Sequence, residues 1–287
     1  MTIVILAVVQ GLVFAALGAA VRVQYSLFRG FDIIIAPIVL LAGESFVLTA
    51  RLFPRPSMLA LCFCTCVSVG VGVTLAVLWN YIVDRLWRGN FILGAAILIL
   101  SLGASSVVSG AVGFSRGPGL RQVEWGMPSL NVFGANLGVP TAYGLFLNLA
   151  ACIWVQVWSR SKIGFAFNLW AQNQSFASEI GVSRRMLLAG AGICTGILGG
   201  VVGAYGALSN GSTPEGGLIM FLYGAGAALL FSKPLVMSGI KGGLLLGALL
   251  VMAQLIFSPP IATVLLFSVV TAILFLRGSS RVSQGLR

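Results

Sequence analysis

Long runs of hydrophobic residues, separated by short polar or charged stretches, dominate the chain from its first residues almost to its last. About 20 consecutive apolar residues are needed for a helix to span the hydrocarbon core of a bilayer. Nine runs approach this length, at roughly 2–21, 32–50, 58–82, 91–112, 141–158, 186–208, 217–235, 242–257 and 261–276. The pattern predicts an all-α membrane helical bundle with about 8–10 transmembrane helices in one transmembrane domain over residues 1–287.

The last three runs, between residues 217 and 276, are the least regular. Pro234, Pro259 and Pro260 interrupt them, and proline ends or kinks a helix. The run 217–235 is glycine-rich, which suits a short or re-entrant helix. In the sixth run, by contrast, Gly192, Gly196 and Gly200 recur every four residues and predict close packing against a neighbouring helix.

Composition supports a membrane protein, because 59% of the 287 residues are apolar and only 8% are charged. Soluble domains have about 25% charged residues. No basic residue precedes the first run, whereas a secretory signal peptide begins with one, so we expect an uncleaved first span. The 17 basic residues are spread thinly between apolar runs, a distribution that indicates membrane topology and not nucleic-acid binding.

The basic residues also predict an orientation, because Lys and Arg are retained on the cytoplasmic side of a membrane. If the N-terminus is outside and all nine runs span, 13 basic residues face the cytoplasm and 4 face outward. The outward set is Arg51, Arg55, Arg116 and Arg121. The reversed topology would invert this bias, so we expect the first orientation. The bacterial cytoplasmic (inner) membrane is the location that the family resemblance described below implies.

The chain lacks the residues that several kinds of catalytic and metal-binding site require. The chain has no His, which removes imidazole triads, metal sites and proton relays. It has only six acidic residues and no clustered carboxylates, no CxxC pair among its five Cys, and no phosphate-binding GxxxxGK[ST] motif. We therefore predict no catalytic residue, no metal site and no cofactor in this chain.

Two acidic residues in the second run are candidates for a substrate pathway, Asp32 at its start and Glu44 midway. A charged side chain at the centre of a bilayer costs about 3 kcal/mol on insertion scales. Glu44 should therefore face a pathway, or be hydrogen-bonded to a neighbouring helix, and the sequence leaves both open. Asn80, Asn148, Gln156 and Gln254 are expected to be interhelical hydrogen-bond partners.

The polar segment 159–185 separates the fifth and sixth runs, and its pattern predicts two short helices at the membrane surface. Ile163, Phe167 and Trp170 fall on one side, while Phe176 and Ile180 fall on another. A polar elbow at 172–175 joins the two helices, and Gly181 suits a helix stop. Such a pair is either a docking surface for a partner or an interfacial anchor.

This segment resembles the coupling segment of bacterial ABC-importer permeases, in the branched-chain amino acid and simple-sugar permease superfamily. The residues that carry the resemblance are Ser161, Gly164, Ala166, Ala171, Asn173, Ala177, Gly181 and Val182. The family often has Arg where Asn168 stands, a difference that removes a salt bridge to the ATPase. Looser matches are the run from Asp32 to Ser45 and the glycine-rich last third, and the amino-acid branch fits better than the sugar branch.

The resemblance implies a transport subunit with no catalytic activity of its own. Such a subunit pairs with a second permease subunit, identical or different, to form a pathway for an amino acid or a similar small polar solute. ATP is bound and hydrolysed by partner ATPase subunits, and an extracytoplasmic solute-binding protein delivers the substrate. The implied ATPase-coupling residues are Ser161, Gly164, Ala166, Ala171, Asn173, Ala177, Glu179 and Gly181. The alternative is a secondary transporter driven by an ion gradient.

Overall fold

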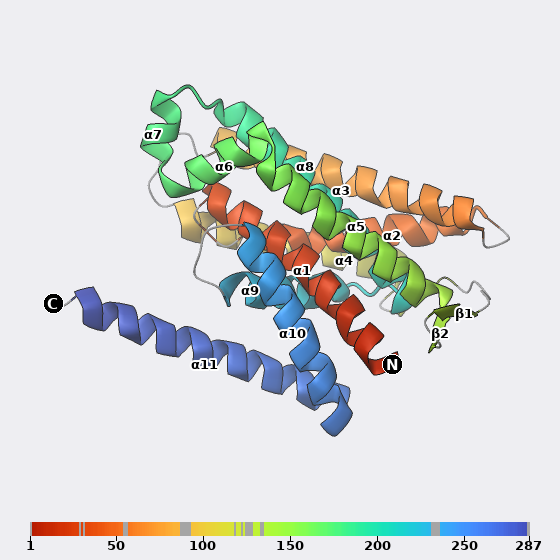
Figure 1. Ribbon diagram of the computed structural model, residues 1–287. Coiled ribbons are helices and arrows are strands. Elements are labelled where there is room, and N and C mark those ends of the chain that lie inside the picture. The colour runs from red at the N-terminus through yellow and green to blue at the C-terminus, as the bar shows by residue number, and fades with distance from the viewer. Residues whose placement is uncertain are drawn as a thin grey trace.

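The computed structural model describes residues 2–28, 30, 32–53, 57–86, 93–117, 119–121, 123, 129–132, 135–230 and 236–285. They form a bundle of helices whose long axes run mostly along one direction (Figure 1). The elements are α1 (Thr2–Phe28), α2 (Ile35–Ala50), α3 (Met58–Leu86), α4 (Leu93–Arg116), β1 (Ser129–Val132), β2 (Ala135–Gly138), α5 (Val139–Arg160), α6 (Lys162–Gln172), α7 (Gln174–Glu179), α8 (Arg184–Ser209), α9 (Gly216–Leu229), α10 (Val236–Ile256) and α11 (Pro259–Gly285).

Each of the nine predicted apolar runs corresponds to one helix, but the described helices differ in length. Six of them, α1, α3, α4, α5, α8 and α10, are long and apolar enough to cross a membrane. The helix α2 has only 16 residues and α9 only 14, and the apolar part of α11 covers Pro259–Ala272. The described residues therefore give a multi-pass helical bundle with six full-length candidate spans, fewer than the predicted 8–10, and α9 is the short helix expected at 217–235.

One short element interrupts the all-α pattern. The strands β1 and β2 form an antiparallel hairpin between α4 and α5, in which Ser129 pairs with Gly138. Hydropathy did not predict this hairpin, which falls within the long polar segment between the fourth and fifth apolar runs. It lies at one end of the bundle, called here the hairpin end, and α6 and α7 lie at the other, the α6–α7 end (Figure 1).

The helix α8 is the most buried of the long helices, because 78% of its most apolar stretch lies inside the bundle. Its glycines allow α3 to approach closely, as the four-residue spacing predicted. A Cβ added to Gly200 would lie 2.6 Å from the Cα of Val69, and one added to Gly192 would lie 2.8 Å from the Cα of Val77. Real side chains cannot occupy that space, so the glycines permit the contact between the two backbones.

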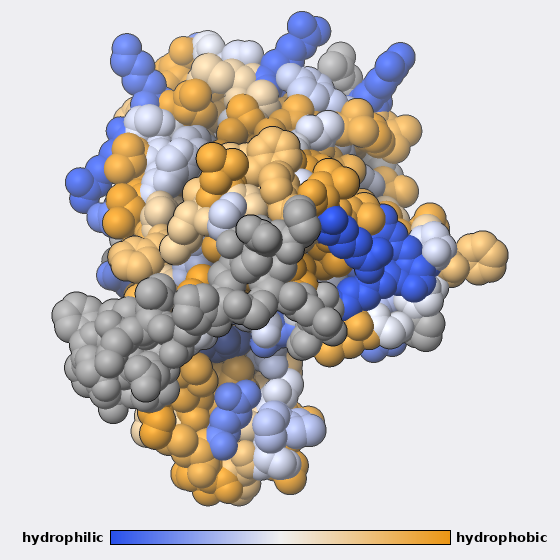
Figure 2. Space-filling model, turned by 90° about the vertical axis from the view of Figure 1, so that its right-hand side faces the viewer, coloured by the Kyte–Doolittle hydropathy of each residue, from blue (hydrophilic) through white to orange (hydrophobic). Residues whose placement is uncertain are grey.

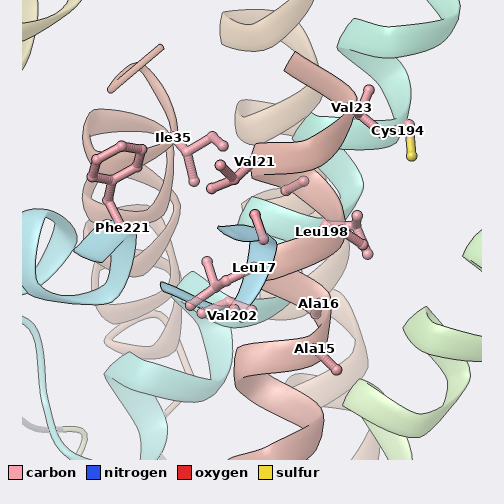
Figure 3. Close-up of a cluster of buried hydrophobic side chains, with 14 of the residues drawn as sticks. Ala15, Ala16, Leu17, Val21, Val23, Ile35, Cys194, Leu198, Val202 and Phe221 are labelled. Carbon is pink, nitrogen blue, oxygen red and sulfur yellow. The ribbon is translucent and has the colours of Figure 1, made fainter. Parts of the chain in front are cut away.

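The hydrophobic core lies where α1, α2, α8 and α9 meet. Figure 3 shows Leu17 of α1 next to Val202 of α8 and Val21 of α1 next to Ile35 of α2, with Phe221 of α9 nearby. Most of these side chains are fully buried. The packing of α1 against α8 therefore continues onto the two short helices.

The two short helices α2 and α9 begin next to each other, beside the middle of the long helices. Ile38, in the first turn of α2, packs against α8 at Gly199, where an added Cβ would lie 2.8 Å from the Cγ2 of Ile38. Gly217, at the start of α9, abuts Ala36 of α2. From this junction α2 runs toward the hairpin end, whereas α9 runs toward the α6–α7 end (Figure 1). Each short helix therefore covers about half of the bundle's length.

Candidate functional site

The helices α6 and α7 form the predicted pair of short helices, between the two long helices α5 and α8. Each has its own N-cap, because a side-chain oxygen there can accept from a backbone N–H that the helix leaves unpaired. Ser161 Oγ accepts from Gly164 N–H at 3.2 Å, and Asn173 Oδ1 accepts from Phe176 N–H at 3.1 Å. Asn173 is therefore the elbow between the two helices, as predicted.

The chain leaves α7 through a tight glycine turn. Gly181 has φ +82°, a conformation that other residues rarely adopt. The N–H of Val182 donates to the carbonyl of Ala177 at 3.0 Å, and the N–H of Gly181 donates to that of Ser178 at 3.1 Å. Gly164 is equally constrained, because a Cβ there would lie 2.7 Å from the Cα of Ser159. These glycines set the shape of the segment.

The remaining motif residues are mostly turned inward. Ala177 is fully buried and Ala166 nearly so, whereas Ala171 is half-buried and Glu179 is exposed. The predicted side of α6 holds the pair to the bundle, because Phe167 and Trp170 are buried and the rings of Phe167 and Trp158 lie 5.7 Å apart.

The apolar surface that the pair exposes consists of other residues. Phe165, Phe176 and Ile180 are 69%, 48% and 54% exposed, and Phe176 and Ile180 share the second side that the helical spacing predicted. All three were missing from the predicted coupling set, although the helical spacing in the sequence points to Phe176 and Ile180. The motif residues thus build the helix pair, and these three side chains are its available apolar contacts.

The end of this segment is tied to α3 and α1. Arg184 Nε, at the start of α8, lies 2.6 Å from Asp84 Oδ1 in an ion pair in which Asp84 is 6% exposed. One turn away on α3, Asn80 accepts from Gln24 Nε2 at 3.2 Å and donates to the carbonyl of Leu188 at 3.0 Å. The interhelical role predicted for Asn80 is confirmed, whereas Asp84 was not among the predicted site residues.

The two predicted pathway residues do not form one site, because Asp32 precedes α2 and Glu44 lies within its second half. Asp32 is 2% exposed and precedes the first turn of α2. Its Oδ1 accepts from Ile34 N–H at 3.0 Å, and its Oδ2 accepts from Trp79 Nε1–H of α3 at 2.8 Å. Asp32 thus fixes the start of α2 against α3.

Glu44 lies in the half of α2 nearer the hairpin end and is 4% exposed. Its Oε2 accepts from Arg116 Nη1 at 2.7 Å and from Arg121 Nη1 at 3.1 Å, and its Oε1 accepts from Ser212 Oγ at 2.8 Å. Of the two expectations for Glu44, the structure shows hydrogen bonding to neighbouring segments. The partners are Arg116 at the end of α4 and two residues between helices, Arg121 and Ser212. A role in a substrate pathway stays a prediction.

A small cavity of about 50 Å³ lies beside this cluster, between α2, α8, α9 and the loop 210–215. Glycine backbone forms much of its wall, through Gly43, Gly203, Gly206, Gly211, Gly216 and Gly217. Ser212, the partner of Glu44, also lines it, whereas neither Asp32 nor Glu44 does. Figure 2 views the hairpin end face on and shows hydrophilic residues in patches on a largely hydrophobic surface.

A second cleft, of about 120 Å³, opens between α2, α3 and α4. It is lined by apolar side chains and by Trp79, the partner of Asp32. Within the described part of the chain, no group of three or more Cys, Asp or Glu side chains is placed to hold a metal ion.

Comparison with known proteins adds no assignment to this geometry: no protein-family model matches the chain, and no curated protein is significantly similar to it.

Proposed function

We propose that the chain is the permease subunit of an ATP-binding-cassette importer in a bacterial cytoplasmic membrane. It forms the solute pathway together with a second permease subunit, identical or different, and takes an amino acid or a similar small polar solute from an extracytoplasmic binding protein. ATP is hydrolysed by partner subunits that dock on α6 and α7. The chain itself carries no catalysis.

The observation that carries this proposal is the rigid helix pair at the α6–α7 end. It is inserted between two long helices, it is capped at Ser161 and Asn173, and it exposes Phe165, Phe176 and Ile180 beyond the bundle. The exposed basic residues Arg160, Lys162, Arg184 and Arg185 lie at this same end, which agrees with a cytoplasmic side. A rigid, partly apolar projection between two spanning helices is suited to transmit the movement of a partner protein.

The test is co-purification of the chain with candidate ATP-binding-cassette ATPase subunits that are co-expressed from the genes neighbouring its own. We expect the unchanged chain to retain the ATPase, and Phe176→Ser combined with Ile180→Ser to lose it, because both side chains leave the docking surface. The control is Phe114→Ser, which removes a 96% exposed aromatic ring at the end of the bundle away from α6 and α7. Equal retention of the ATPase by the double variant and by the unchanged chain would refute docking on this surface.

The second candidate is a secondary transporter driven by an ion gradient. The observation that favours it is the junction of α2 and α9, because many such transporters have broken helices that meet near the middle of the membrane. The two candidates differ in their energy source. Uptake into proteoliposomes that requires ATP and the ATPase supports the importer, whereas uptake by this chain alone with an imposed ion gradient supports the secondary transporter.

A further inference from the structure

The loop 210–215, which joins α8 to α9, forms one side of the glycine-lined cavity. Asn210, Gly211, Ser212 and Thr213 line the cavity from this loop, and the other sides are helices. Those helices are packed too closely to part easily: a Cβ on Gly203 of α8 would lie 2.5 Å from the carbonyl oxygen of Val39 on α2. The loop is therefore the side of the cavity that can open with the least disturbance.

The loop is held in place from outside its own helices. Ser212 and Arg121 exchange two backbone hydrogen bonds, of 3.1 Å and 2.8 Å, as in an antiparallel strand pair. Ser109 Oγ of α4 donates to the carbonyl of Pro214 at 2.9 Å. The helix α4 and the segment that follows it therefore hold the loop in place at the side of the cavity.

Glu44 lies at the centre of these contacts and joins three segments that are distant in the sequence. One carboxylate on α2 accepts from Arg116 at the end of α4, from Arg121 in the next segment and from Ser212 in the loop. Arg121 in turn donates through Nη2 to the carbonyls of Arg116 and Gly117, which fixes its guanidinium. Because Glu44 is 4% exposed, these groups replace the water that a carboxylate otherwise requires.

We propose that the loop 210–215 is a lid over the glycine-lined cavity and that Glu44 is the latch that holds the lid shut. The lid opens when Ser212 separates from Glu44 and from Arg121. Gly211, with φ +78°, and Gly216 flank the moving part and supply the backbone freedom for a hinge. The lid opens the cavity toward the hairpin end, and it does not depend on an ATPase or on any particular solute.

The test is the accessibility of the cavity to a hydrophilic thiol reagent in the purified full-length chain. Ala207 lines the cavity and is 2% exposed, so Ala207→Cys places a thiol that reacts only when the lid opens. Cys62 and Cys66 are exposed and are replaced by Ser, whereas the other three cysteines are buried. The rate of labelling of this reporter chain is then compared with and without changes at the latch.

We expect Glu44→Gln to increase the labelling rate about tenfold and Ser212→Ala to increase it by a smaller factor. Glu44→Asp, which keeps the charge, should restore most of the protection. The control is Arg51→Gln, which also replaces a charged side chain by Gln but at an exposed position directly after α2, and which should leave the rate unchanged.

Two outcomes overturn the lid: equal labelling rates in Glu44→Gln and the parent, or an equal acceleration by Arg51→Gln. General unfolding is recognised in the Glu44→Gln chain without Ala207→Cys, because its buried thiols then react as well. In that event Ser212→Ala decides, because it removes the hydrogen bond between the loop and Glu44 and leaves both ion pairs in place, and an unchanged labelling rate in Ser212→Ala refutes the latch. Loss of ATPase binding by the α6–α7 variants leaves this result unaffected, so the two proposals fail separately.

Discussion

The close contact between α8 and α3 makes Gly200→Ala a demanding test of the packing. The added Cβ would lie 2.6 Å from the Cα of Val69 and 3.0 Å from the carbonyl oxygen of Ser68. Both neighbours are backbone atoms, so no side chain can rotate away. An ordinary van der Waals contact begins near 3.4 Å, and the two helices must therefore separate by at least 3.4 − 2.6 = 0.8 Å at this point.

The expected change in stability on Gly200→Ala is the sum of two opposed effects. Replacing glycine by alanine within a helix stabilises it by up to about 1 kcal/mol, because the unfolded backbone loses freedom. Overfilling a well-packed interior costs about 1–3 kcal/mol, and here the strain falls on backbone. Gly206→Ala, on the same helix, isolates the first effect, since its Cβ meets nothing within 4 Å. We expect Gly200→Ala to be less stable than Gly206→Ala by about 2 kcal/mol.

The assay is reversible unfolding of the purified chain in mixed micelles, with the helical circular dichroism followed as the fraction of SDS rises. Gly206→Ala should unfold at the same or a higher SDS fraction than the unchanged chain, and Gly200→Ala at a clearly lower one. If Gly200→Ala is as stable as Gly206→Ala, the two backbones are not in contact at this point and the reasoning from the glycine spacing is wrong.

Three further substitutions test other contacts. Gly181→Val forces a β-branched residue into the φ +82° turn, at a cost of about 1–2 kcal/mol, so the amide of Val182 should exchange hydrogen faster, whereas Gly181→Asn should change it little. Asn80→Leu removes the hydrogen-bond partner of Gln24 and of the carbonyl of Leu188, and it should destabilise the chain by about 1 kcal/mol in the SDS titration. The control is Thr74→Ala, whose exposed hydroxyl donates to a carbonyl of its own helix, and it should change the stability by less than about 0.5 kcal/mol. Arg121→Gln should lower stability more than Arg116→Gln in the same titration, because Arg121 is 14% exposed and Arg116 31%, and screening by solvent weakens the more exposed pair.

The helices could be located from the sequence because lipid and buried packing both select continuous apolar residues. All nine runs contain a helix. Their positions along the bundle could not be found in this way, since hydropathy reports how apolar a segment is and not where it begins. The half-length placement of α2 and α9 depends on the contact of Gly217 with Ala36, two residues that are far apart in the sequence.

The candidate site likewise has features that the sequence predicted and contacts that it could not predict. The local features of α6 and α7, including the Asn173 elbow and the Gly181 turn, follow from residues a few positions apart, and the sequence predicted them. The environment of Glu44 depends on Arg116, Arg121 and Ser212, which are separated from it by 72, 77 and 168 positions. A single sequence contains no signal for such pairs, so it left the role of Glu44 open.

The short helix α2 connects the two ends at which the proposals are made. Near the hairpin end Glu44 joins it to the lid, and at its start Asp32 joins it to Trp79 of α3. Five residues further along α3, Asp84 pairs with Arg184, which directly follows the α6–α7 segment. A displacement of α3 caused by a partner at α6–α7 would therefore reach the start of α2 through one buried hydrogen bond. In that case Trp79→Phe, which keeps the ring and removes the N–H donor, should leave ATPase binding intact but abolish any effect of the bound ATPase on the labelling of Ala207→Cys. If that effect persists in Trp79→Phe, the two ends are coupled by another route, such as the glycine contacts between α3 and α8.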